Sequence, residues 1–116
     1  MHELSVTQSL IDLILEEVEQ RSIKSVKKVG ISVGVFTTFE PYAINFYFET
    51  LKTEYPPLKD TVLEIELKPG VCRCQECGKD FEVKETVSNL PQCPHCGSIF
   101  VEIKEGREFL INYLEV

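Results

Sequence analysis

Four cysteines in the second half of the chain form two Cys-x-x-Cys-Gly pairs. The first pair is Cys74-Gln75-Glu76-Cys77-Gly78, and the second is Cys93-Pro94-His95-Cys96-Gly97. In each pair a tight turn can present two thiolates to one ion, and the following glycine suits the left-handed backbone that closes such a turn. Fifteen residues separate the pairs, an interval typical of zinc sites built in this way. The spacing therefore predicts a tetrahedral metal site with the ligands Cys74, Cys77, Cys93 and Cys96.

Other uses of paired cysteines fit this chain less well. A thioredoxin-type redox pair needs one Cys-x-x-Cys within a βαβ pattern, which the sequence lacks. A disulfide framework is typical of secreted chains, and no apolar signal segment opens this sequence. An iron site of the rubredoxin kind uses the same four ligands, so iron stays open as an alternative. We expect zinc because nothing else in the sequence indicates electron transfer.

A second candidate metal site is the N-terminal sequence Met1-His2-Glu3. A lone histidine near a terminus is usually a mobile polar residue, but its position here allows more. If Met1 is retained, its amine and the His2 backbone nitrogen can close a five-membered chelate ring, and His2 Nδ1 an adjacent six-membered ring. Together with the Glu3 backbone nitrogen this is a planar four-nitrogen set, which suits Ni(II) or Cu(II) and not tetrahedral zinc. Binding should release protons and weaken at low pH.

The Glu3 carboxylate has two interpretations, and both can hold together. It can orient His2 through a hydrogen bond outside the ligand set, a kind of contact that tunes metal affinity. It can also be an acidic residue favoured by the positive end of the first helix. Cys72, two residues before Cys74, also has two possible roles. It is either a free thiol beside the metal site or a ligand that exchanges with Cys74.

Two helices are predicted from apolar residues at helical spacing. The first runs from about Val6 to Arg21, with Ser5-Val6-Thr7-Gln8 as a capping box in which Ser5 is the cap. Its core-facing residues are Leu10, Ile11, Ile14, Leu15 and Val18. The second starts at Pro41, a residue suited to a first helical turn, and continues to the stop at Pro56-Pro57.

Alternating apolar residues predict the strands. In Val29–Val35 the apolar side chains alternate with Gly30, Ser32 and Gly34, which would let a helix pack closely on that face. Phe109–Leu114 is apolar on both sides, which suits the middle of a sheet. Further strands are expected at Leu63–Leu67, at Phe81–Val83 and at Ile99–Ile103.

Composition limits the classes of function. Hydrophobic residues are 43% of the 116 residues, enough for a core, and no run is long enough to span a membrane. The net charge is −7. Between residues 70 and 103 three basic residues stand against five acidic ones, whereas nucleic-acid-binding zinc modules need a basic footprint. We therefore expect no nucleic-acid or membrane partner, and reduced cysteines without a targeting segment indicate the cytoplasm.

The order of these features resembles one known family. Met-His-Glu at the start, an amphipathic first helix and two Cys-x-x-Cys pairs before the last strand resemble the HypA nickel-insertion factors, which assist maturation of NiFe-hydrogenase. The resemblance covers essentially the whole chain. It implies nickel binding at Met1, His2 and Glu3, chiefly through His2 and the main chain. It also implies a structural zinc on the four cysteines, a GTPase partner (HypB) and delivery to the hydrogenase large subunit, with urease accessory proteins as partners of some members.

These observations combine into one expectation. The fold class is α+β: a small mixed sheet of about three strands with two flanking helices and an inserted four-cysteine zinc-ribbon-like module. Residues 1–69 plus 104–116 would form the nickel-binding domain, and residues 70–103 the zinc-binding module. We expect no enzyme, because four cysteine ligands leave no open position for an activated water. The alternative is a zinc-ribbon protein-interaction module without nickel cargo. His95 is interpreted as a solvent-facing turn residue, with a nickel-linked role as its alternative.

Overall fold

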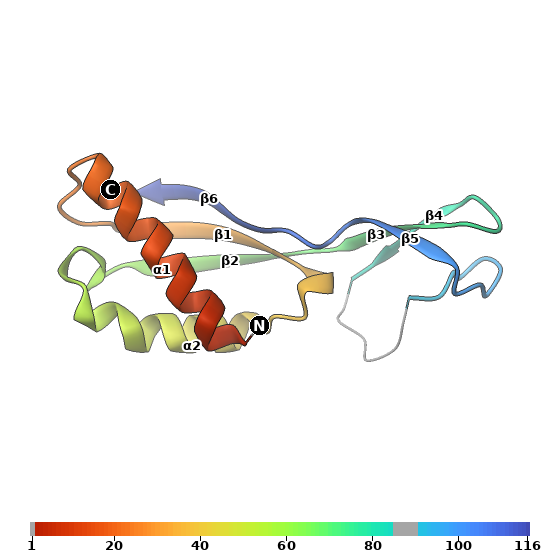
Figure 1. Ribbon diagram of the computed structural model, residues 1–116, viewed down its shortest axis with the longest axis horizontal. Coiled ribbons are helices and arrows are strands. Elements are labelled where there is room, and N and C mark those ends of the chain that lie inside the picture. The colour runs from red at the N-terminus through yellow and green to blue at the C-terminus, as the bar shows by residue number, and fades with distance from the viewer. Residues whose placement is uncertain (1, 85–90) are drawn as a thin grey trace. The chain divides into compact units, whose positions relative to one another are not determined.

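The structure, a computed structural model, describes residues 2–84 and 91–116 (Figure 1). Within these residues it contains the helices α1 (Glu3–Gln20) and α2 (Pro41–Leu51) and three short 3-10 helices, Val35–Thr37, Lys52–Glu54 and Pro56–Leu58. The strands are β1 (Lys28–Gly34), β2 (Val62–Lys68), β3 (Gly70–Cys74), β4 (Asp80–Val83), β5 (Val101–Glu105) and β6 (Phe109–Glu115). They form two three-stranded sheets, ordered β2-β1-β6 and β4-β3-β5. The predicted α+β class is confirmed.

Residue contacts divide the chain into two compact units. The first consists of the residues up to Ile31, Phe39–Glu66 and Leu110–Val116, and the second of Ser32–Thr38 and Leu67–Phe109. The first unit contains both α-helices, and the second contains the sheet that carries the cysteine pairs. Among the described helices, none combines the length and the apolar character that crossing a membrane requires.

The first helix starts earlier than the capping pattern predicts. α1 begins at Glu3, and its N-cap is His2, whose extended backbone lets its carbonyl accept the Val6 N–H at 3.1 Å. The predicted cap Ser5 is wrong: it lies inside the first turn, where helical backbone geometry prevents an N-cap role. The Gln8 side chain donates to a carboxylate one turn further along instead of reaching back. The helix therefore begins directly at the candidate nickel residues.

Both helices bury the faces that their periodicity indicates. α1 buries Leu10, Ile11, Ile14 and Val18, as predicted, while Leu15 is half-buried. α2 starts at Pro41 as predicted and buries Ile44 and Phe48 completely. It ends at Leu51, before the predicted stop, because the chain continues in two 3-10 turns. The two helices pack against each other, and in Figure 1 the start of α1 lies beside the start of α2.

The sheet of the first unit corrects the prediction for β6. β1 is the central strand and buries nearly all its residues, whereas β6 lies at an edge, with Leu110 56% and Tyr113 42% exposed. Gly30 on β1 faces the ring of Tyr113 and not a helix, so the expected helix contact there is wrong: a Cβ on Gly30 would overlap this ring. The Tyr113 hydroxyl donates to the Glu64 carboxylate on β2. The Tyr113 side chain therefore reaches from β6 across the central strand β1 to β2.

The sheet of the second unit is antiparallel. β3 pairs with β4 on one side and with β5 on the other, so that Cys72 is opposite Phe81 and Cys74 is opposite Val101. A bulge interrupts the β3–β5 register between Val71 and Cys72. The predicted strand at Phe81–Val83 is β4, and the one at Ile99–Ile103 starts two residues later, at Val101. The central position of β3 fixes the first cysteine pair at the end of a paired strand.

Candidate metal centres

Each cysteine pair closes a turn in the same way. The N–H of Gly78 donates to the Cys74 carbonyl at 3.0 Å, and the N–H of Gly97 donates to the Cys93 carbonyl at 2.8 Å. The two glycines have φ values of +76° and +81°, a left-handed backbone that only glycine adopts without steric cost. The turns therefore have the conformation that the Cys-x-x-Cys-Gly spacing predicts.

The two turns bring their four sulfurs together. The ligand atoms of Cys74, Cys77, Cys93 and Cys96 all lie within 4.8 Å of one another. The Sγ–Sγ distance is 3.5 Å between Cys74 and Cys96 and 3.7 Å between Cys77 and Cys93. In a tetrahedral zinc–thiolate site with bonds of about 2.3 Å, the sulfurs are about 3.8 Å apart. The cluster therefore has the dimensions of a tetrahedral site, and its soft sulfur donors suit zinc.

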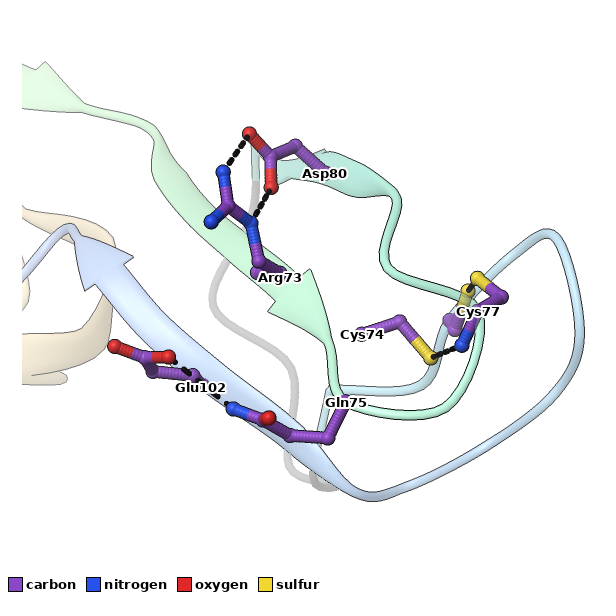
Figure 2. A network of polar contacts seen from close by, with 7 residues as sticks. Arg73, Cys74, Gln75, Cys77, Asp80 and Glu102 are labelled. Carbon is purple, nitrogen blue, oxygen red and sulfur yellow. Dashed lines mark hydrogen bonds and ion pairs between the residues drawn. The ribbon is translucent and has the colours of Figure 1, made fainter.

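Backbone donors favour a thiolate at the first cysteine of each pair. The N–H of Cys77 donates to Cys74 Sγ at 3.4 Å, as the dashed line in Figure 2 shows, and the N–H of His95 donates to Cys93 Sγ at 3.4 Å. The Cys77 N–H is the main cause that lowers the pKa of Cys74 to about 6. The first turn therefore favours the thiolate form of Cys74.

The second thiol of each pair, Cys77 and Cys96, resists ionisation, and the pKa of both is raised. For Cys96 the N–H of Ser98 favours the thiolate, but the neighbouring thiol groups, Cys74 foremost, and burial outweigh it and raise the pKa to about 12. Four thiolates this close repel one another, since like charges disfavour each other's ionised form. A bound dication removes this repulsion, so metal binding to the cluster should release protons.

Polar contacts hold the first turn in its sheet (Figure 2). Arg73 donates to both carboxylate oxygens of Asp80, with Nε–Oδ1 at 2.8 Å and Nη2–Oδ2 at 3.4 Å, which joins β3 to β4. The Gln75 side-chain amide donates to Glu102 Oε2 on β5 at 3.1 Å. These contacts are exposed and individually weak. Together they link the first turn to both strands that flank β3.

Cys72 and His95 lie outside the group of four. Cys72 is completely buried in β3, and burial raises the pKa of its thiol. Alternation along β3 buries Cys72 and Cys74 and exposes Arg73 between them. The alternation of apolar and polar residues in this segment was therefore the sequence signal that Cys72 is buried. His95 is exposed, and its backbone, not its ring, contacts the cluster.

At the N-terminus, Met1 lies outside the described residues, while His2 and Glu3 are placed. His2 is exposed at the N-cap of α1, and Glu3 is the first helical residue. The first N–H groups of a helix have no carbonyl partner within it. The helix itself therefore needs neither the His2 nor the Glu3 backbone nitrogen, the two main-chain donors of the predicted nitrogen set.

The Glu3 carboxylate makes a contact that the sequence did not indicate. Its Oε2 accepts the backbone N–H of Glu40, the N-cap of α2, at 3.2 Å. This N–H is the main cause that lowers the pKa of Glu3. The Glu40 carboxylate in turn accepts the Tyr42 N–H at 3.3 Å. The starts of α1 and α2 are thus joined by a hydrogen bond through Glu3.

Comparison with known proteins adds independent information. A family model described as "Hydrogenase/urease nickel incorporation, metallochaperone, hypA" matches residues 1–116. The hydrogenase maturation factor HypA of Moorella thermoacetica is 40% identical over 115 residues, which are 99% of this chain and 98% of that protein. That of Aquifex aeolicus is 36% identical over 116 residues, 100% of this chain and 97% of that protein.

A solved structure also matches over nearly the whole chain. The solution structure of the Ni metallochaperone HypA from Helicobacter pylori superposes with a TM-score of 0.67 at 29% identity. The match covers 99% of this chain and 97% of that one.

Proposed function

Because this chain belongs to the HypA family of nickel metallochaperones for hydrogenase maturation, we propose that it binds its nickel cargo through Met1, His2 and Glu3. The ligands are the terminal amine, the His2 ring and the main-chain nitrogens of His2 and Glu3. The observation that supports this most is the start of α1 at Glu3. It places the backbone nitrogens of His2 and Glu3 at a helix end whose first N–H groups have no intrahelical carbonyl partner.

The four-cysteine cluster is proposed to hold a structural zinc. Its ligands would be Cys74, Cys77, Cys93 and Cys96, and the sulfur spacing near the edge of a zinc–thiolate tetrahedron supports this. Four protein ligands close the coordination sphere, so the ion would stabilise the β4-β3-β5 sheet and activate no water. Iron in the same four-sulfur site is the alternative that metal analysis distinguishes.

The two sites divide the work of a metallochaperone, which must select its ion and also give it up. Four thiolates hold a soft metal tightly, whereas one imidazole with main-chain nitrogens at a helix start can be displaced one ligand at a time. We assign nickel to the part formed by residues 1–69 plus 104–116, and zinc to the module of residues 70–103.

The proposed partners follow from membership of the family. Nickel would be delivered to the hydrogenase large subunit in the cytoplasm, with a GTPase accessory protein of the HypB type as co-partner. Urease accessory proteins are further candidate partners, since the family description includes urease.

The deciding experiment compares His2→Ala with His95→Ala in protein that has a free Met1 amine. The chain has two histidines, so His95→Ala is a matched control that removes an imidazole without touching the N-terminus. Calorimetry with Ni(II) should detect binding by the wild type and by His95→Ala and none by His2→Ala. Zinc content should be equal in all three proteins.

Two outcomes contradict the proposal. Normal nickel affinity in His2→Ala would overturn the ligand assignment. A wild-type protein with zinc and no nickel binding would instead favour the zinc-ribbon interaction module.

A further variant with two residues added before Met1 keeps every side chain and removes the free Met1 amine, so it should bind nickel much more weakly.

A further inference from the structure

α2 presents two aromatic side chains to solvent next to the proposed nickel site. Tyr42 is 80% and Phe46 58% exposed, and residues four apart lie on one face of a helix. We name this pair the α2 ridge. The Phe46 ring also meets the Tyr47 ring edge-on, with centroids 5.6 Å apart. Two large apolar rings, one restrained by a neighbour, stand out on a helix whose opposite face is fully buried.

The position of the α2 ridge connects it to the cargo. Tyr42 is in the first turn of α2, and its N–H is held by the Glu40 carboxylate, while the Glu40 N–H is held by Glu3. The ridge therefore starts two residues from the contact that fixes the N-terminal end of α1. Leu4, adjacent to Glu3 in α1, adds a further apolar side chain that is 48% exposed.

The sequence segments that form α1 and α2 are acidic, and the first basic residue after α2, Lys52, pairs with Glu49 at 2.9 Å. The sequence has no lysine or arginine before Arg21 and none between Val29 and Leu51. The same segments carry seven acidic residues, Glu3, Asp12, Glu16, Glu17, Glu19, Glu40 and Glu49. A second copy of this chain, with its own net charge of −7, is disfavoured here by repulsion. A basic surface is favoured, because complementary charge steers encounter and excludes wrong partners.

We propose that the α2 ridge is the docking surface for the protein that receives the nickel, an apolar recess with a basic rim on the hydrogenase large subunit. This inference rests on the proposed function. An ion held at Met1, His2 and Glu3 can pass directly only to ligands brought within bonding distance, so the acceptor must contact the surface beside them. Exposed aromatic residues are the usual anchors of such contacts, and i, i+4 pairs on a helix fit a groove.

The test separates docking from metal binding. Nickel-loaded wild type and the double variant Tyr42→Ser/Phe46→Ser are mixed either with purified nickel-free large subunit or with the small chelator pyridylazoresorcinol. The double variant should bind nickel normally and release it to the chelator at the wild-type rate. Transfer to the large subunit should be slower by about tenfold or more, as for loss of two interface anchors. Phe100→Ser, at a position 65% exposed in the second unit, is the matched control and should transfer normally.

A second pair of variants tests the charge and leaves both rings in place. Asn45 is exposed on α2, three residues from Tyr42. Asn45→Lys should slow transfer to the large subunit at low salt, and Asn45→Glu should not. The difference should shrink as salt screens the charges.

The outcomes distinguish the proposals. If the double variant binds nickel normally and transfers it to the large subunit at the wild-type rate, the docking proposal is overturned and the proposed function stays intact. Equal slowing with the chelator also overturns it, because the ridge would then act on the metal site. Gel filtration that shows a wild-type dimer lost in the double variant would assign the ridge to self-association and overturn it as well. Failure of the wild type to bind nickel overturns the proposed function, and the docking proposal with it.

Discussion

Replacing Gly30 with alanine should destabilise the β2-β1-β6 sheet, because the new methyl group would meet the ring of Tyr113. Three ring atoms lie closer to the added Cβ than real Cβ contacts allow. The ring is held from the other side, where its hydroxyl donates to Glu64. The substitution therefore forces the Tyr113 ring away from its position over the central strand β1.

The magnitude follows from two opposing effects. Overpacking by one methyl group typically costs about 1–3 kcal/mol. Glycine inside a strand is itself unfavourable relative to alanine by about 0.5–1 kcal/mol, which the substitution recovers. Tyr113 is 42% exposed and has room to swing outward, so we expect the lower part of the range. The net loss should be about 0.5–1 kcal/mol, or a urea midpoint lower by about 0.2–1 M.

The assay is urea unfolding followed by helical circular dichroism, which reports on α1 and α2 in the same unit as Gly30. A double-mutant cycle with Tyr113→Ser identifies the cause. With serine at 113 the ring is absent, and Gly30→Ala should become neutral or stabilising. Equal destabilisation in both backgrounds would refute the reasoning, since the cost would then arise without the ring. A stabilising effect in the wild-type background would refute it as well.

Two further predictions concern the metal centres. Cys77→Ser should lower bound zinc severely, whereas Cys72→Ser should leave it equimolar, because Cys72 lies outside the cluster of four sulfurs; metal analysis after dialysis checks both, and zinc loss in Cys72→Ser would contradict the assignment. The hydrogen bond from the Glu40 N–H to the Glu3 carboxylate should depend on pH, because it lowers the pKa of Glu3. The contact is fully present above the ordinary pKa of 4.5 and is lost as the pH falls through the lowered pKa. The amide NMR signal of Glu40 should report this loss on acidification and should not show it in Glu3→Gln; identical titrations in both proteins would exclude the contact.

The cysteine cluster was predictable because its determinants are local. A Cys-x-x-Cys-Gly turn is specified within five residues, and Gly78 and Gly97 adopt the left-handed backbone that the pattern indicates. The helical face around Ile11 and Ile14 was predictable for a similar reason, since periodicity within one helix decides which side chains are buried.

The sequence misled or was silent where distant segments decide the structure, and at one helix start that has no capping pattern. The apolar sequence of Phe109–Leu114 reports hydrophobicity but not strand order, and β1 rather than β6 took the central position. The start of α1 was missed because His2 caps it without a side-chain hydrogen bond, leaving no capping pattern to recognise. The contact from Glu3 to Glu40 joins residues 37 positions apart, a separation at which single-sequence periodicity carries no information.

The division of the chain into two units also affects how such a protein can recombine. The chain passes between the units after Ile31, Thr38, Glu66 and Phe109, so neither unit is one continuous stretch of sequence. A single genetic crossover between two relatives therefore cannot exchange the second unit by itself, because Phe39–Glu66 of the first unit lies between its two segments. A chimera that takes Leu67–Phe109 from one parent inherits Ser32–Thr38 from the other. Functional hybrids should consequently be rare unless both segments are inherited together, and variation in the two segments should be selected as a pair.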